Sequence, residues 1–135
     1  PLVKTRHQLL MIPTVDEIRS IALSLGWNDF GITEAAIPEE DIQAYKTWLQ
    51  NNYHADLGYM ENELRCYPEK LLPGAQTAII FVSYYKQPKQ EFRSDAGLIA
   101  SYARGRDYHN VHRKRLKKFI QWLEEKTGLQ NIAKG

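Results

Sequence analysis

The sequence predicts a layered domain of the α/β (α+β) class, with a central sheet flanked by helices. Three observations lead to this prediction. A capping box at Thr14 opens a run of helically spaced apolar residues. Residues 77–85, TAIIFVSYY, form a nearly continuous β-branched and aromatic run, which is typical of a buried strand. Residues 107–126 carry the apolar spacing of a long helix.

Length and composition fit one domain. The chain has 135 residues, of which 43% are hydrophobic and 25% are charged. A chain of this length can bury a core without disulfides or a metal. We expect residues 1–13 to be an N-terminal extension and residues 14–135 to form the domain.

The first helix and the first strand have local signals. Thr14 can cap the first N–H groups of a helix while Glu17 reaches back, and Gly26 supplies the stop. The apolar positions of this helix are Val15, Ile18, Ile21, Ala22 and Leu25. Residues 27–33, WNDFGIT, then predict a short strand.

The middle of the chain predicts a second helix, a loop and a strand. Pro38 suits the first turn of a helix that extends to about Gln50. Its apolar stripe comprises Ile42, Tyr45, Trp48 and Leu49. We expect residues 53–75 to be loop-like, with one helical turn. Because the run at 77–85 lacks alternation, we expect that strand to be buried on both faces.

The last third predicts a loop, a strand and the long helix. Residues 86–95 are polar and predict a loop, and residues 98–103 predict another strand. The helix over 107–126 is closed by Gly128. Its inward side chains are expected to be Tyr108, Val111, Leu116, Phe119, Ile120 and Leu123. Its outward side chains are expected to be Arg113, Lys114, Lys117 and Lys118.

Charge is concentrated in one part of the chain. The net charge is only +2, but residues 101–120 hold seven lysines and arginines against one aspartate. This local charge of +6 leaves −4 for the rest of the chain. A basic stripe on an otherwise acidic chain favours a local anionic partner.

The cysteine and hydropathy patterns set the expected compartment. Cys66 is the single cysteine, so it forms no internal disulfide and cannot by itself hold an iron–sulfur cluster or a structural zinc ion. A reducing, cytoplasmic location follows as the expectation. No apolar run approaches the ~20 residues that span a bilayer, so we expect no membrane contact.

Residues 103–109, ARGRDYH, are the strongest candidate site. Gly105 allows a sharp turn or a close approach to a ligand, and Asp107 is a natural N-cap. Arg104 and Arg106 can clamp a phosphate or carboxylate, while two further side chains can donate protons. These proton donors are Tyr108 and His109. From the residues alone, a plain helix cap with solvated arginines explains the same pattern.

Other features are weaker. The basic helix face of Arg113, Lys114, Lys117 and Lys118 suits RNA phosphates, although such faces are usually only solvated. The segment that contains Tyr53 and His54 suits a lid over a flat ligand. His7 and His112 lack metal-ligand spacing and are expected at the surface. Phosphate-loop, dinucleotide-binding, zinc-protease, CxxC and GxSxG motifs are absent, and no metal site is expected.

Four stretches in order resemble one enzyme family over residues 14–126. They are LGWNDFGIT, WLQNNYHADLGYM, LLPGAQTAIIFVSYY and IASYARGRDYHNVHRKRLKKF. Together they resemble the N-terminal domain of epoxyqueuosine reductase, an oxidoreductase that completes queuosine biosynthesis in tRNA.

The resemblance implies a function and a set of site residues. The family reduces an epoxide in the wobble nucleoside, in the anticodon stem-loop of tRNA, with cobalamin and two 4Fe-4S clusters. Its N-terminal domain is an α/β unit that holds much of the cobalamin. The resemblance implies cofactor contacts from residues 104–109 and from Tyr53 and His54, with Tyr108 and His109 near the chemistry.

Departures from the family pattern limit what this chain is expected to do alone. The cysteine runs that hold the family's clusters are absent, as is the strand with its catalytic aspartate. We therefore expect a monomeric N-terminal fragment, inactive by itself, whose electron donor the sequence does not identify. Two alternatives stay open, a non-enzymatic RNA-binding module and a cobalamin carrier or processing protein.

Overall fold

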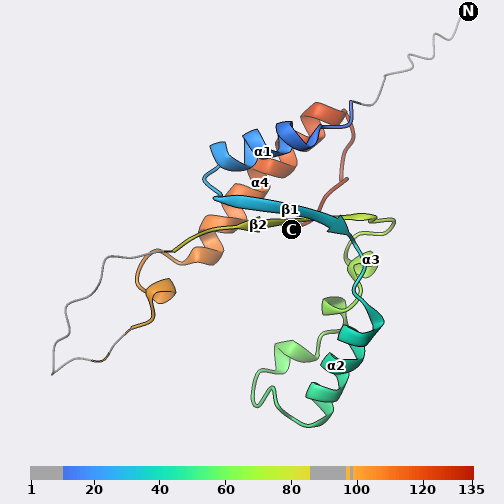
Figure 1. Ribbon diagram of the computed structural model, residues 1–135, viewed down its shortest axis with the longest axis vertical. Helices are drawn as coiled ribbons and strands as arrows, with labels where there is room; N and C mark the ends of the chain where they lie inside the picture. The colour runs from blue at the N-terminus through green and yellow to red at the C-terminus, as the bar shows by residue number, and fades with distance from the viewer. Residues whose placement is uncertain (1–10, 86–96, 98) are drawn as a thin grey trace, which may run out of the picture. The chain divides into compact units, whose positions relative to one another are not determined.

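The computed structural model describes residues 11–85, 97 and 99–135 (Figure 1). Helices and strands both occur, which confirms the predicted class. The main elements are α1 (Val15–Ser24), β1 (Asp29–Glu34), α2 (Glu39–Gln50), β2 (Thr77–Val82) and α4 (Tyr108–Thr127). β1 and β2 pair as an antiparallel two-stranded sheet. Hydrogen bonds at both ends of the pair fix this register, from Asn28 N–H to the Val82 carbonyl at 2.8 Å and from Ala35 N–H to the Gln76 carbonyl at 2.9 Å.

The chain divides into two compact units. The first unit comprises Pro1–Phe30, Phe81–Ala133 and Gly135, and it contains α1 and α4. The second unit comprises Gly31–Ile80 and Lys134, and it contains α2 and the short helices that follow. Each unit has buried side chains of its own.

The first unit is built on aromatic packing. Trp27 is 3% exposed and stacks on Phe81, with ring centroids 4.0 Å apart and an interplanar angle of 13°. Phe119 of α4 meets both rings edge-on, at 6.4 Å from Trp27 and 4.9 Å from Phe81. Ile18 and Ala22 of α1 are also buried. Aromatic pairs at these separations stabilise a core beyond the area that they bury.

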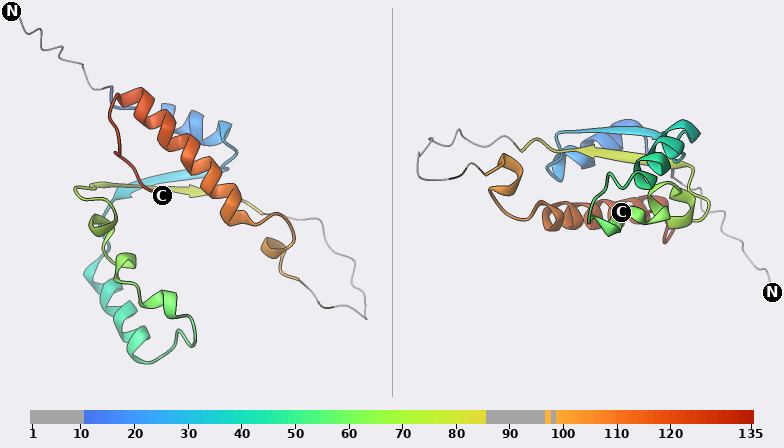
Figure 2. Two further views of the ribbon diagram at one scale, coloured as in Figure 1. Left: turned by 180° about the vertical axis from the view of Figure 1, so that it is seen from behind. Right: turned by 90° about the horizontal axis from the view of Figure 1, so that it is seen from below.

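The predicted ends of α1 and α4 are confirmed. The Thr14 hydroxyl accepts a hydrogen bond from the Glu17 N–H at 3.2 Å, and the Glu17 carboxylate accepts one from the Thr14 N–H at 2.9 Å. α4 begins after its N-cap Asp107 and ends at Gly128, whose φ of 72° is left-handed. Figure 2, in the view from behind, shows α4 as one unbroken helix. Lys126 of α4 donates to Glu17 of α1 at 2.6 Å, so the two helices are tied together.

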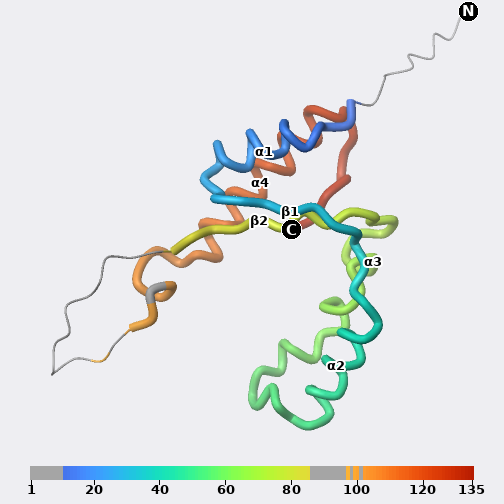
Figure 3. The backbone as a smooth tube through the Cα atoms, in the orientation of Figure 1, coloured from blue at the N-terminus to red at the C-terminus, as the bar shows by residue number. Residues whose placement is uncertain are grey.

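The second unit contains more helical segments than the sequence predicted. α2 begins after Pro38, as expected. Three further helical segments replace the single predicted turn. Figure 3 traces the chain through this part in green. They are η1 (Gly58–Glu61), η2 (Glu63–Arg65) and α3 (Pro68–Leu71). Ile42, His54 and Cys66 are buried in this unit.

Three expectations are wrong. β2 is not buried on both faces, because Ile80 and Val82 are 56% and 38% exposed, and β1 is the only strand paired with it among the described residues. The strand predicted over 98–103 is instead a short helix, η3 (Ser101–Ala103), whose Ala103 N–H donates to the Ala100 carbonyl. Tyr108 is 45% exposed rather than inward, because it occupies the first position of α4, beyond the buried aromatic core.

Some expectations lie outside the described residues. These are the loop over 86–95, the start of the strand predicted at Leu98, the surface position of His7 and most of the N-terminal extension. The predicted outward face of α4 is confirmed, since Arg113, Lys114, Lys117 and Lys118 are all exposed.

Candidate functional site

The start of α4 is organised by Asp107. One carboxylate oxygen, Oδ1, accepts the backbone N–H of His109 at 2.9 Å and lies 3.0 Å from the Nδ1 atom of the same histidine. The other oxygen accepts the side-chain amide of Asn110 at 2.8 Å. The side-chain hydrogen bond with His109 is the main reason that the pKa of Asp107 is lowered from its ordinary value, and the backbone bond adds to it. Asp107 therefore orients the His109 ring and leaves its Nε2 atom for another partner.

Four rings from three separate segments of the chain meet beside this helix start. Tyr85 follows β2, Tyr102 belongs to η3, and Tyr108 and His109 open α4. Ring centroids lie 6.5 Å apart for Tyr85 and Tyr102 and 6.3 Å apart for Tyr102 and Tyr108, both nearly perpendicular. Tyr108 and His109 stack at 4.0 Å. We call these four residues the ring ladder.

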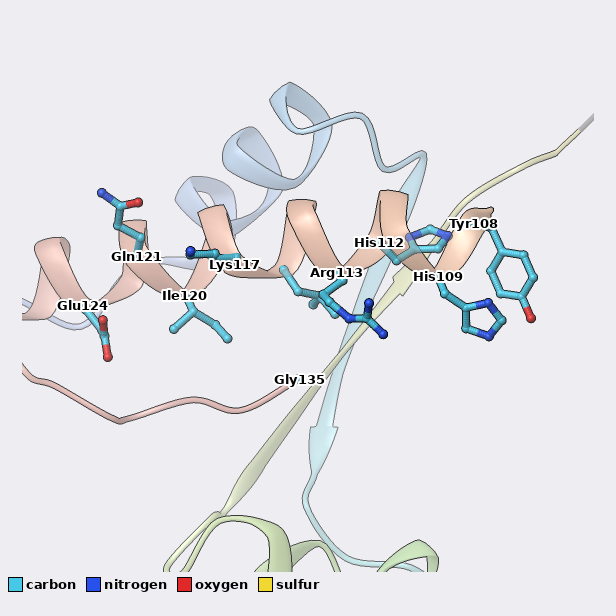
Figure 4. A pocket seen from close by; sticks show the side chains of 10 residues that line it. Tyr108, His109, His112, Arg113, Lys117, Ile120, Gln121, Glu124 and Gly135 are labelled. Carbon is cyan, nitrogen blue, oxygen red and sulfur yellow. The ribbon is translucent and has the colours of Figure 1, made fainter. Parts of the chain in front are cut away.

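A cavity of about 710 Å³ runs along the same helix (Figure 4). Its lining combines the apolar side chains of Leu116 and Ile120 with polar side chains, among which Arg113 and Lys117 are cations and Glu124 is a carboxylate. The lining residues are Tyr108, His109, His112, Arg113, Leu116, Lys117, Ile120, Gln121, Glu124 and Gly135. An apolar surface with a few polar groups at its edge is the usual character of a small-molecule site.

His112 is a lining residue that the sequence analysis placed at the surface. It is half-buried, and its Nδ1 atom accepts a hydrogen bond from the indole N–H of Trp27 at 3.3 Å. Because an indole nitrogen only donates, the proton of the His112 ring is on Nε2. The helical spacing of the sequence could have indicated this position, because His112 lies one turn after Tyr108 and His109 and lines the same cavity.

The remaining residues of the ARGRDYH segment connect η3 to α4. Arg104 is half-buried, and Gly105 and Arg106 are exposed. Gly105 does not have a positive φ, and a Cβ atom built on it would meet nothing within 4 Å among the described residues. Local backbone geometry thus gives no reason for a glycine at this position, and a close approach by a ligand stays a prediction.

Tyr53 and His54 belong to the second unit. Tyr53 is 68% exposed. His54 is 7% exposed, its ring lies 5.7 Å from that of Trp48, and its Nε2 atom is 3.1 Å from the Glu61 carboxylate. Its Nδ1 atom is buried without a hydrogen-bond partner in the described part of the chain. Their assignment to the cofactor stays a prediction.

Neither a metal-binding cluster nor a membrane-spanning helix occurs among the described residues. No group of three or more histidine, cysteine, aspartate or glutamate side chains is placed to hold a metal ion in residues 11–85, 97 and 99–135. Within the same residues, no helix combines the length and the apolar character needed to cross a membrane.

Comparison with known proteins gives consistent results. Residues 65–133, which include the ARGRDYH segment and α4, match the family described as Epoxyqueuosine reductase QueG, DUF1730. A protein from Cyclobacterium marinum named epoxyqueuosine reductase is 37% identical over 82% of this chain and 37% of its own length. Proteins of the same name from Leadbetterella byssophila and Yersinia pestis are 34% and 33% identical, over 83% and 93% of this chain and 37% and 32% of their own lengths.

The chain therefore spans about a third of the length of these curated relatives. No solved structure matches it. The family match covers half of the chain and includes the candidate site. The chain belongs to the epoxyqueuosine reductase family QueG, DUF1730.

Proposed function

We propose that this chain is the cobalamin-binding part of an epoxyqueuosine reductase that reduces epoxyqueuosine to queuosine in tRNA. The observation that carries the proposal is the cluster at the start of α4. There, Asp107 positions His109 beside Tyr108, and both rings line a cavity that also offers apolar side chains and the cations Arg113 and Lys117. The relatives named epoxyqueuosine reductase supply the reaction class.

The residues present fit cobalamin. That cofactor has a wide, flat ring with amide groups at its edge and a phosphate. Leu116 and Ile120 offer an apolar surface for the ring, while Arg113, Lys117 and the Nε2–H of His112 provide cations and a donor for the polar groups. Arg104 and Arg106, which precede α4 in the chain and do not line the cavity, are proposed cofactor contacts from the resemblance alone. When bound, cobalamin would supply the reducing chemistry.

The side chains of this chain would then manage protons. Converting an epoxide to an alkene breaks both carbon–oxygen bonds, consumes two electrons and two protons, and releases the oxygen as water. We assign one proton donation to the Tyr108 hydroxyl or to Nε2 of His109, since Nδ1 of His109 is engaged by Asp107. The electrons would come from the iron–sulfur clusters that the resemblance places outside this chain.

The tRNA would be held partly by charge. Arg113, Lys114, Lys117 and Lys118 are exposed on α4. Phosphate contacts of this kind fix the position of a nucleic acid and weaken with salt. Lys114 and Lys118 do not line the cavity and would contact the tRNA backbone, while Arg113 and Lys117 lie at the cavity and would be shared between cofactor and tRNA.

Turnover by the longer enzyme tests the proposal. We expect Tyr108→Phe or His109→Ala, made in a protein that also contains the cluster-binding part, to lower the rate of epoxyqueuosine reduction about 100-fold, the usual scale for a lost general acid. Tyr84→Ala is the matched control, because Tyr84 is exposed and its ring contacts none of the ring ladder in the described chain. Wild-type rates in both site variants would remove these residues from the chemistry.

A second candidate function is a non-enzymatic RNA-binding module, favoured by the exposed basic face of α4. Triple substitution of Lys114, Lys117 and Lys118 by glutamate would then abolish salt-dependent tRNA binding. If tRNA binding and cobalamin binding use different residues, the same variant should still show the absorption change of bound cob(II)alamin. Absence of any cobalamin effect in the wild-type chain, with tRNA binding retained, would favour this second candidate.

A further inference from the structure

The ring ladder is an unusual surface feature. Tyr85, Tyr102 and Tyr108 are 63%, 57% and 45% exposed, and the His109 side chain is 64% exposed. Single exposed aromatic residues are common and need no explanation. Here four exposed rings contact one another in a row although they come from three separate segments of the chain, so they form one continuous aromatic surface.

Core packing does not account for these rings. The aromatic core of the first unit consists of Trp27, Phe81 and Phe119, and none of these three rings contacts the ladder within the described chain. Each near-perpendicular contact, at 81° and 82°, and the Tyr108–His109 stack cover at most one face of each ring per contact, and the exposed fractions of the four side chains leave ring surface accessible to solvent. The ladder therefore presents several flat faces to a ligand.

The charges around the ladder indicate the kind of ligand. Arg104 and Arg106 lie in the chain between Tyr102 and Tyr108, and Arg113 follows about one turn after His109. The one acidic residue between Ser101 and Ile120 is Asp107, and its carboxylate is already bonded to His109 and Asn110. Aromatic faces bordered by cations favour a chain of flat groups joined by anions.

We propose that the ring ladder is a stacking platform for unpaired bases of single-stranded RNA. Each base has a π-face that stacks on an aromatic side chain, while arginines and lysines follow the phosphates. Double-stranded RNA fits poorly, because its bases are already stacked and paired. The inference rests on the proposed function and deepens it, since it assigns the loop nucleotides beside the modified nucleoside to Tyr85, Tyr102, Tyr108 and His109.

Fluorescence anisotropy with two RNA probes tests the proposal. One probe is a fluorescein-labelled RNA single strand of about seven nucleotides, and the other is the same strand annealed to its complement. We expect this chain to bind the single strand more tightly. The double variant Tyr85→Ala/Tyr102→Ala should lose about 5- to 100-fold in affinity for the single strand, the range measured for lost base stacking. Its salt dependence should not change, because every cation remains.

Two control variants separate stacking from folding. Tyr102→Phe keeps the ring, so its affinity should stay within about twofold of the wild-type value. Tyr84→Ala removes an equally exposed ring, 71% exposed, that lies outside the ladder, so it should bind like wild type. Circular dichroism of each variant checks that α4 and the core are intact.

Three results would overturn the proposal. They are equal affinity of the double variant and wild type, equal affinity of wild type for single-stranded and duplex RNA, and no binding of either probe. The first two would assign RNA binding to charge alone. None of these results would by itself contradict the proposed function. That function is tested separately, by cobalamin absorption and by the turnover of Tyr108 and His109 variants, and neither test changes Tyr85 or Tyr102.

Discussion

Different interactions predominate inside each of the two units of this chain. In the first unit, Trp27, Phe81 and Phe119 come from distant parts of the sequence and pack ring against ring. In the second unit, helices of three or four residues follow one another and are joined by polar bonds. Examples are the Tyr45 hydroxyl donating to the Met60 carbonyl and Lys70 paired with Glu63 at 2.8 Å. Apolar packing therefore supports the helix that carries the candidate site, and hydrogen bonds shape the other unit.

The contrast has a functional consequence. A site needs rigid support, and a long helix anchored by a buried ring provides it. α4 offers that anchor at Phe119, three turns beyond the candidate site. The second unit places a buried histidine, His54, where an apolar residue would be usual. We expect substitutions in the two units to differ in size and in kind.

The largest effect is expected from Phe119→Ala. Removing a ring that is 3% exposed and contacts Trp27 and Phe81 should lower the free energy of unfolding by about 3–5 kcal/mol. Urea denaturation measures it. Leu23→Ala on α1, where the side chain is 53% exposed, is the control and should cost far less. An equal loss of unfolding free energy in the two variants would contradict the claim that the buried aromatic rings stabilise this unit.

Ile42→Ala tests the apolar part of the second unit. Ile42 is 5% exposed, so its truncation should cost about 2–4 kcal/mol. Hydrogen exchange measured by mass spectrometry should show that the variant exchanges faster than wild type in peptides from α2, with a smaller increase in peptides from α1. An equal increase of the exchange rate in both units would show that Ile42 does not stabilise the second unit separately from the first.

Tyr45→Phe tests the polar part of the second unit. The variant removes only the hydroxyl that donates to the Met60 carbonyl and leaves that carbonyl without its partner. The expected loss is about 1 kcal/mol in urea denaturation. Tyr53→Phe removes an exposed hydroxyl from the same unit and should be neutral. A neutral Tyr45→Phe variant would show that hydrogen bonding contributes less to this unit than its geometry implies.

The smallest effect is expected from pH, in the first unit. The hydrogen bond from Lys126, followed by the Thr14 backbone bond, lowers the pKa of Glu17 from 4.5 to about 2. A carboxyl group with a lowered pKa in the folded state stabilises the fold above its unfolded pKa. That stability is lost as pH falls from about 4.5 to about 2.

Thermal unfolding between these pH values checks the prediction. Glu17→Gln should flatten part of the acid loss, whereas Asp16→Asn removes a neighbouring charge without touching the Lys126 pair. An unchanged pH dependence in Glu17→Gln would contradict the role of this pair. The pair is partly exposed, so added salt should weaken its contribution.

Much of the fold could be predicted from local signals. The capping box at Thr14, Pro38 before α2, Asp107 before α4 and the glycine at 128 each act on the adjacent backbone, so one sequence is enough to read them. The short helices after α2 could not all be read in this way, because they are also held by bonds between residues further apart, such as Tyr45 to the Met60 carbonyl and Lys70 to Glu63. The helix propensity of individual residues does not reveal such contacts.

The candidate site was predictable as a segment but not as an arrangement. ARGRDYH indicated an N-cap beside cationic and proton-donating groups, and Asp107 confirms the cap. Tyr85, Tyr102 and His112 were missed as site residues because their neighbours come from other elements. Trp27 is 85 positions from His112, and only the folded chain brings them into contact.

A titration of this chain with cob(II)alamin, followed by visible absorption, tests the central claim most directly. That claim is that the start of α4 forms a cofactor site. We predict a saturable spectral change that weakens in His109→Ala and in Arg106→Ala and persists in Tyr84→Ala. No change, or a change of equal affinity in every variant, would contradict the claim and return ARGRDYH to the role of a helix cap.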